Sequence, residues 1–583
     1  MRPRPSFLFA VPLLACLLAA PASAAPKKTA PADEPFFGSV DVNVVTVEVF
    51  VTDKDGKFVP DLTQADFEIR EDGKPVEITN FFVASGAPAA GPEAAPGAPA
   101  APLPPEQRLY LTIFFDNQTL QPAARNRVLA SLKDFVRTRL APGDQVMVVS
   151  YDGPGSMKVR QASTDSPGAV TAVLDEVATA PALGIDRQVD LRILLRQIEN
   201  ASTPNPRSRN QSDALAQADT LYAGIRLYGE QRYQEIRHSL KALGGFVDAL
   251  AGLPGRKAVL YVSGGMSLRP AETLFQAWQL RFGSIVRLTN FASPLAGFQT
   301  DTTTLFREIG ERANANRVTF YSLGLPVVES ASTAESSGSE VWTRDQENRE
   351  ILGLTQSLLL VAAPTGGQAA IDPNKPEVLL GQMRYDFDHY YSLGYAPADR
   401  KKPGNHKIEV KVTRPGLQVR HREGYRDRTT RDRLNQQTMA ALLFGTGVEN
   451  PLDVEVRFEG ERAARKNKKE REVSLLVIFP MAKLVLLPQD RVHEGRVTVL
   501  LGTRDGEGRT SDITQIDVPV RVPDAQLSAA MGQSVAYRAT LLMRPGPHTL
   551  VVGVRDEYGN VNSTVTIPYA GPAESAKPAR RGR

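Results

Sequence analysis

The chain has 583 residues, of which 42% are apolar and 23% charged, the composition of a globular protein with three or four domains. Its net charge of +4 excludes the dedicated nucleic-acid-binding class, whose members carry a concentrated basic face. Cys16 is the one cysteine, so a chain that loses it on export has no disulfide and no thiolate metal site.

The N-terminus is typical of a secretory signal. Arg2 and Arg4 precede an apolar stretch, which is followed by the small residues Ala22, Ser23 and Ala24. We predict residues 1–24 to be a signal peptide cut after Ala24, and the mature protein to be periplasmic or extracellular. The apolar stretch is too short to span a bilayer, and no later stretch is long and apolar enough, so we expect no integral membrane segment.

After export, the first folded segment is expected to be β-structure. Residues 25–37 are rich in Pro, Ala and Lys, which predicts disorder. Residues 38–83 contain a β-branched run and the turn sequences DKDG and EDGK, which predict a small β module. About 45 residues is marginal for independent folding, so this module should pack on another part of the chain. Residues 84–106 form a Pro/Ala-rich linker.

Residues 107–396 alternate apolar strand-like runs with helical periodicity, which predicts a doubly wound, mainly parallel α/β sheet covered on both faces. Within this domain we expect a helical insertion at 181–232 and a mobile loop at 326–350. The expected strands are LYLTIFF (109–115), QVMVVSY (145–151), KAVLYVS (257–263), RVTFYSLGL (317–325) and HYYSLGY (389–395).

The rest of the chain is mainly β. Seven strand-like runs separated by turn residues predict an immunoglobulin-like sandwich at 449–570, although the Cys–Trp–Cys signature is absent. The fold class is therefore α/β with flanking all-β modules. The remaining segments are a β-hairpin at 397–428, with pairing to 38–83 as a hypothesis, a helical connector at 429–448 and a disordered tail at 571–583.

Asp116 ends the first expected α/β strand, where open α/β sheets bind their ligands. The segments LYLTIFFDNQT, GDQVMVVSYD and GRKAVLYVSGG resemble a von Willebrand factor type A (VWA) domain. With FVPDLTQADFEIREDGK before them and YYSLGYAP, KIEVKVTR and VRHREGY after them, they resemble the exported VWA-related proteins common in acidobacteria. The resemblance covers roughly residues 40–426.

The resemblance implies a metal-ion-dependent adhesion site, which begins with Asp-x-Ser-x-Ser after the first strand. The matching positions are Asp116, Gln118 and Leu120, and Gly264 stands where a later aspartate is expected. Leucine and glycine side chains offer no oxygen to Mg²⁺. We therefore expect no bound metal and no cofactor, with Asp116 and Thr119 as vestigial ligands of a degenerate site. Helix capping or loop bonding by Asp116 is the structural alternative.

Other chemistry is weakly supported. The six histidines lack metal-ligand spacing, and YVSGGMS lacks the glycine that precedes the serine of a nucleophile elbow at Ser263. Asp386, Asp388 and His389 are expected to open a strand and to be structural. PTGG (364–367) lacks the lysine of a P-loop.

We therefore expect an exported, non-catalytic protein that binds an unknown protein partner, not nucleic acid. The alternatives are Mg²⁺-dependent adhesion through Asp116 and Thr119, and, less favoured, an exported hydrolase. The expected partner-binding face at the strand tips consists of Asp116, Asn117, Gln118, Thr119, Ser263 and Gly264.

Overall fold

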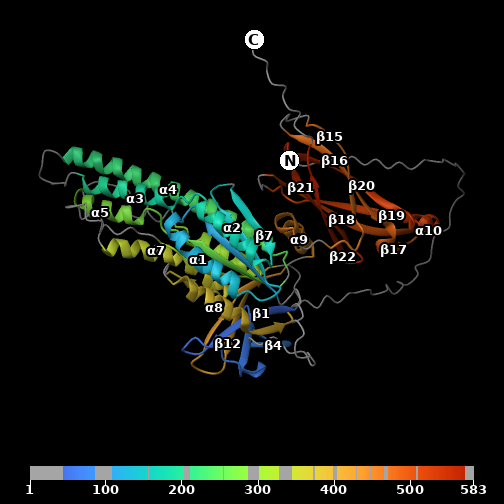
Figure 1. The fold of residues 1–583 in the computed structure, drawn as a ribbon, viewed down its shortest axis with the longest axis horizontal. Helices are drawn as coiled ribbons and strands as arrows, with labels where there is room; N and C mark the ends of the chain where they lie inside the picture. The colour runs from blue at the N-terminus through green and yellow to red at the C-terminus, as the bar shows by residue number, and fades with distance from the viewer. Residues whose placement is uncertain are drawn as a thin grey trace, which may run out of the picture. The chain divides into compact units, whose positions relative to one another are not determined.

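The computed structural model describes residues 44–85, 108–154, 156–201, 211–253, 255–286, 301–326, 344–371, 375–397, 404–427, 430–445, 449–464, 470–506 and 510–571 (Figure 1). The predicted signal peptide, the segment 25–37, nearly all of the linker and the C-terminal tail lie outside these residues. Among the described helices, none combines the length and the apolar character needed to cross a bilayer.

The α/β part is built on a six-stranded mixed sheet with the order β10-β9-β8-β5-β6-β7. Neighbouring strands from β10 to β6 pair in parallel, and β7 pairs with β6 in the antiparallel direction. Strand β7 escaped prediction because only Met157 and Val159 of its side chains pack on the core. The strands are β5 (Leu109–Asp116), β6 (Gln145–Tyr151), β7 (Met157–Thr164), β8 (Arg256–Ser263), β9 (Val318–Gly324) and β10 (Ala369–Ala370).

Helices cover both faces of this sheet. Alternate residues of β5 point to opposite faces, so Ile113 and Phe115 join one apolar core and Phe114 joins the other. This burial on both faces explains the uninterrupted apolar runs of the strands. The first face carries α1 (Pro122–Thr138), α2 (Pro167–Thr179) and α8 (Pro376–Asp388), and the second carries α4 (Gln211–Leu250), α6 (Thr303–Ala315) and α7 (Arg344–Ala362).

Two sequence expectations for this region need correction or completion. Residues 344–350, expected in a mobile loop, begin α7, while 327–343 lie outside the described residues. The insertion at 181–232 contains two helical segments: α3 (Gly184–Glu199) and the first half of α4 pack with α5 (Glu272–Val286) around Trp278 and Phe282. This helical insertion therefore has an apolar core of its own.

The small β module combines segments from both sides of the α/β sheet. In Figure 1 its blue N-terminal strands lie with the gold strands from near residue 400. The described parts of 38–83 and 397–428, together with residues 389–395, form two four-stranded sheets, β13-β1-β11-β4 and β14-β12-β2-β3, around one apolar core. The strands are β1 (Val45–Thr52), β2 (Phe67–Glu71), β3 (Lys74–Val76), β4 (Asn80–Ser85), β11 (His389–Tyr395), β12 (Asn405–Val412), β13 (Gln418–His421) and β14 (Gly424–Arg426).

The expectation that residues 389–395 form a strand of the α/β sheet is wrong. Strand β11 pairs antiparallel with β1 and β4 in the small β module. Its alternate residues Tyr391, Leu393 and Tyr395 are fully buried in the core of that module. The period-2 pattern is that of an antiparallel strand with one buried face, and it is present in the sequence YSLGY.

A charged cluster lies where β1 approaches the strand ends of the α/β sheet. The Glu48 Oε1 atom is 2.6 Å from Arg317 Nη2, and Arg256 and Arg422 line the same pocket. Burial by itself raises the pKa of Glu48, but the positive charges of Arg317, Arg422 and Arg256 outweigh it and lower the pKa to about 2. Glu48 is therefore ionised in the folded protein at all ordinary pH values.

Glu48→Gln should destabilise the protein at pH 7 and have little effect near pH 2. The folded-state pKa is depressed, so the stabilisation is present above the unfolded pKa of 4.5 and is lost as the pH falls towards about 2. A shift of this size corresponds to about 3 kcal/mol at neutral pH. Urea unfolding of both proteins between pH 2 and pH 7 measures the difference. A pH-independent difference, or one as small as that of the exposed Glu455→Gln control, would contradict this assignment.

The C-terminal part is a β-sandwich of two antiparallel sheets. Leu475 and Val477 from one sheet and Val499 and Val552 from the other share one core. All seven expected strands form, and β17 is an additional short one. The first sheet contains β15 (Glu455–Ala463), β16 (Arg471–Pro480) and β20 (Ser534–Met543); the second contains β17 (Leu487–Gln489), β18 (Val492–Asp505), β19 (Thr514–Pro523), β21 (His548–Asp556) and β22 (Val561–Tyr569). The connecting helix is α9 (Thr430–Phe444).

Candidate functional site

Asp116 is the last residue of β5, and its backbone shapes the loop that leads to α1. The Asp116 carbonyl accepts hydrogen bonds from the amides of Thr119 and Leu120, and its Oδ1 atom accepts one from the Gln118 amide at 3.3 Å. Helix α1 begins later, at Pro122, without a side-chain cap. Asp116 therefore does not cap the helix; it closes its own loop.

Three hydroxyl groups surround the second oxygen of the Asp116 carboxylate. Tyr261 donates to Oδ2 at 3.0 Å, Thr119 at 3.0 Å and Ser263 at 3.3 Å. The Thr119 and Ser263 hydroxyls are also 2.9 Å apart. With only 1% of Asp116 exposed, these donors replace the water that a carboxylate otherwise needs. The protein's own hydroxyl groups therefore satisfy this carboxylate oxygen.

Gly264 completes this hydroxyl network through its backbone. Its amide donates to the Thr119 hydroxyl at 3.0 Å. A Cβ atom at position 264 would lie 2.3 Å from the Thr119 carbonyl oxygen, a distance that no side chain tolerates. The aspartate that the family resemblance places here therefore has no room, because the loop backbone already fills the position.

A second set of hydrogen bonds, made by Arg125 and Asn117, holds the same loop between β5 and α1. Arg125, on α1 and completely buried, donates to Asn117 Oδ1 at 2.9 Å and to the carbonyls of Ala178 and Ala180. Burial lowers the pKa of the Arg125 guanidinium. The Asn117 amide in turn donates to Asp152 Oδ1 at 2.8 Å. The loop is thus tied to α1, to the end of α2 and to the turn after β6.

Asp152 carries the ionic part of this arrangement. Burial by itself would raise the pKa of Asp152. The hydrogen bonds from Asn117 and Lys158 and the positive charge of Arg160 have the larger effect and bring the pKa below its usual value. Lys158 and Arg160 lie 3.1 and 3.0 Å from Asp152 Oδ2. At the outer edge of the site, 53% of the Lys158 side chain is exposed.

The first residues of the helical insertion cover the loop. The Leu183 amide donates to the Asn117 carbonyl at 2.8 Å, and the Gly184 amide donates to the Leu120 carbonyl at 3.0 Å. A Cβ atom on Gly184 would lie 2.4 Å from the Thr119 carbonyl oxygen. Backbone thus packs directly on backbone, and the insertion closes the site from this side.

The structure brings all six predicted face residues together, but it turns most of them inward. Gln118 alone is partly exposed, and its amide donates to the Asp152 carbonyl at 2.9 Å. Leu120, at the third position of the family motif, is a core residue. The buried members of the predicted face are Asp116, Asn117, Thr119, Ser263 and Gly264.

Sequence reasoning missed three members of the site. Tyr261 lies two residues before Ser263 on β8, so the strand period alone places both on the same face. Arg125 lies on the apolar face of α1, three residues before Val128, which was a usable signal for a buried arginine. Asp152 directly follows β6, so its place at a strand end was also a usable signal, but its contact with Asn117 depends on the fold.

The cluster DFDHYY lies elsewhere and is partly misassigned by the sequence. Asp386 and Asp388 belong to the last turn of α8, so the expectation that they open a strand is wrong; only His389 begins one. Asp386 accepts from Arg420 at 2.7 Å and from the Tyr321 hydroxyl at 2.9 Å. These bonds join α8 to β13 and β9, a structural role.

No family model and no curated protein matches the chain. Among solved structures, an aerotolerance-related membrane protein from Bacteroides fragilis is 9% identical with a TM-score of 0.20, over 48% of this chain and 98% of that one. The pilus adhesin SpaC from Lactobacillus rhamnosus GG is 9% identical with a TM-score of 0.23, over 87% and 56%.

The type V pili tip protein Mfa5 from Porphyromonas gingivalis, represented by three N-terminal domains, is 9% identical with a TM-score of 0.22, over 90% and 77%. Similarities this low carry no argument about function. The function of this chain has to be inferred from its own residues.

Proposed function

We propose that the chain is an exported, non-catalytic protein-interaction or adhesion protein, which binds its partner at the strand-tip edge of a VWA-like α/β domain. The observation that supports this proposal is that groups of the protein itself donate hydrogen bonds to both carboxylate oxygens of Asp116. Donors from Gln118, Thr119, Tyr261 and Ser263 hold its two oxygens. The partner is therefore bound by the exposed residues around the strand tips, and binding needs no metal ion at Asp116.

The exposed and partly exposed residues at this edge come from the loops that follow β5, β6 and β8 and from the start of β7. We call Gln118, Pro154, Ser156, Lys158 and Arg269 the strand-tip rim. Lys158 and Arg269 are 53% and 42% exposed and give the rim two cationic side chains. Asp152, Glu272 and Asp301 lie beside them, which limits the net charge and favours a protein surface of mixed polarity over a polyanion.

A photo-crosslinking amino acid at position 158 should capture the partner on intact cells of the source organism, and the same group at position 137 should not. Arg137 is exposed near the end of α1, which leads away from the strand tips, so it is a matched control. Mass spectrometry of the adducts identifies the captured protein. Equal capture at both positions, or none at position 158, would contradict the proposal.

The same experiment separates this proposal from Mg²⁺-dependent adhesion. If Asp116 held an ion that bridged to the partner, EDTA would abolish capture at position 158 and Asp116→Asn would do the same. Since its hydrogen-bond partners are internal, we expect capture to be unchanged by EDTA.

A further inference from the structure

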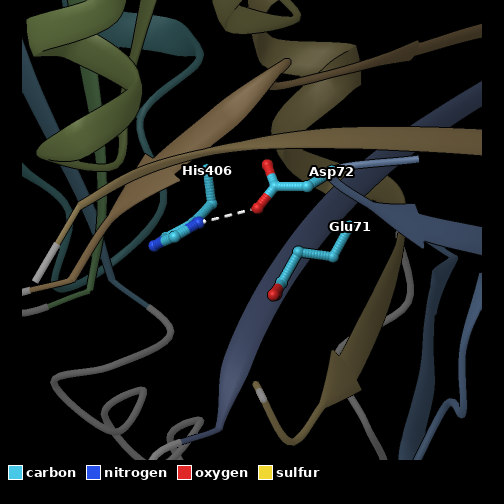
Figure 2. Close-up of side chains that lie close together, drawn as sticks. All are labelled: Glu71, Asp72 and His406. Carbon is cyan, nitrogen blue, oxygen red and sulfur yellow. Dashed lines mark hydrogen bonds and ion pairs between the residues drawn. The ribbon is translucent and has the colours of Figure 1, made fainter. Parts of the chain in front are cut away.

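A second polar cluster lies far from the strand tips, in the small β module. Its members are Glu71 and Asp72, at the turn between β2 and β3, and His406 on β12. One ligand atom from each lies within 4.8 Å of the others. Figure 2 shows the Asp72 carboxylate and the His406 ring facing each other, with the Glu71 side chain reaching toward the same space.

The chain places these side chains by two local rules. Asp72 and Gly73 form the two-residue connection of the β2–β3 hairpin, both with positive φ (50° and 79°), as a type I′ turn requires. Glu71 pairs with Ile408 in the ladder between β2 and β12, which brings the turn beside His406. Residues 334 positions apart thereby meet, and the Asp72 Oδ2 to His406 Nδ1 distance is 3.0 Å.

Each of the three side chains is also held on its outer side. His406 Nε2 is 2.9 Å from Asp427 Oδ2, the Lys407 amide donates to Asp72 Oδ1 at 2.9 Å, and the Tyr425 hydroxyl donates to Glu71 Oε2 at 2.8 Å. A histidine that ligates a metal through one nitrogen and gives the other N–H to a carboxylate is the usual outer-shell arrangement of metal sites, and ligating carboxylates are hydrogen-bonded in the same way.

An independent observation comes from Tyr395 on β11. Its side chain is completely buried, and its hydroxyl lies beside the Glu71 carboxylate. The hydroxyls of Tyr395 and Tyr425 thus both lie beside Glu71, as the outer-shell groups that orient a ligating carboxylate do.

We propose that Glu71, Asp72 and His406 bind a divalent transition-metal ion, Zn²⁺ in the first instance, which clamps the β2–β3 turn to β12. One imidazole and two carboxylates suit Zn²⁺, whereas Mg²⁺ and Ca²⁺ prefer oxygen ligands alone. Metal–ligand bonds of about 2.0–2.2 Å at tetrahedral angles place ligand atoms about 3.3–3.6 Å apart, so binding requires a small rearrangement of atoms that now lie from 3.0 Å to within 4.8 Å of one another. The Asp72 side chain is 43% exposed and leaves a path from solvent.

The test uses the whole chain without a histidine tag, stripped with a chelator and then dialysed against Zn²⁺. We expect one bound ion per chain by elemental analysis and a rise in the melting temperature, because a ligand specific for the folded state stabilises it. Asp72→Asn and His406→Gln should each abolish both effects. Asp427→Asn should weaken binding by about 10–100-fold, as loss of an outer-shell carboxylate does.

Asp72→Asn is expected to fold normally, so a loss of Zn²⁺ binding in this variant cannot be attributed to misfolding. Asparagine tolerates positive φ and keeps the acceptor for the Lys407 amide, so only the negative charge is lost. His493→Gln is the matched control, because His493 pairs with Asp524 at 3.0 Å outside the cluster Glu71, Asp72 and His406. Absence of bound Zn²⁺ in the wild type, or unchanged binding in Asp72→Asn and His406→Gln, would overturn the proposal. So would loss of the ion in Asp116→Asn, which would place it at the strand tip.

Discussion

Gly264→Ala should cost the protein about 3 kcal/mol of stability, the upper end of the usual range for overpacking. The added Cβ atom would meet the Thr119 carbonyl oxygen at 2.3 Å. Because the contact is with backbone, no rotamer change relieves it, and the loop between β5 and α1 has to move. That movement also separates the Gly264 amide from the Thr119 hydroxyl and opens the hydroxyl network at Asp116.

Gly245→Ala is the matched control for this substitution. Gly245 lies exposed within α4, and a Cβ atom there has nothing within 4 Å. Alanine at this position should stabilise the helix by about 0.5–1 kcal/mol. Urea unfolding followed by circular dichroism measures both variants. If Gly264→Ala is as stable as the wild type, the backbone packing around Thr119 is not as described, and an aspartate at this position is sterically possible.

Arg125→Met should destabilise the protein by about 2–3 kcal/mol, because it removes hydrogen bonds to three acceptors, of which the Ala178 carbonyl keeps another from the Asn126 side chain at 3.2 Å. Asn117 Oδ1 and the carbonyls of Ala178 and Ala180 accept hydrogen bonds from this guanidinium. A buried acceptor left without a donor costs about 1–3 kcal/mol. Burial lowers the Arg125 pKa, so relief of a buried charge offsets part of the loss.

Arg127→Met separates this effect from a general effect of losing an arginine on α1. Arg127 is exposed on the same helix, and its replacement should change stability by no more than about 0.5 kcal/mol. Amide hydrogen exchange of residues 116–120 should also accelerate in Arg125→Met alone. Equal stability of the two variants would mean that the loop does not depend on the buried guanidinium.

Elements with a strong local pattern were predictable from the sequence. The apolar runs of β5, β6, β8 and β9 are buried on both faces, which leaves an uninterrupted signal. The sandwich strands are marked by alternation and turn residues, and all seven formed. In contrast, β7 has an irregular register with β6 and a polar sequence, so its pairing is decided by the hairpin geometry and not by its own pattern.

The proximity of the predicted site residues was predictable from the sequence, whereas their hydrogen-bond partners were not. The sequence by itself determined that Asp116 ends a buried strand, that Thr119 follows it and that Leu120 and Gly264 cannot ligate a metal. Only the tertiary structure decided that Tyr261 and Ser263 satisfy Asp116, and that the insertion at Gly184 closes the loop. The physical reason is that a strand tip follows from local periodicity, whereas the environment of a carboxylate depends on contacts between residues distant in sequence, such as Asp116 and Tyr261, 145 positions apart.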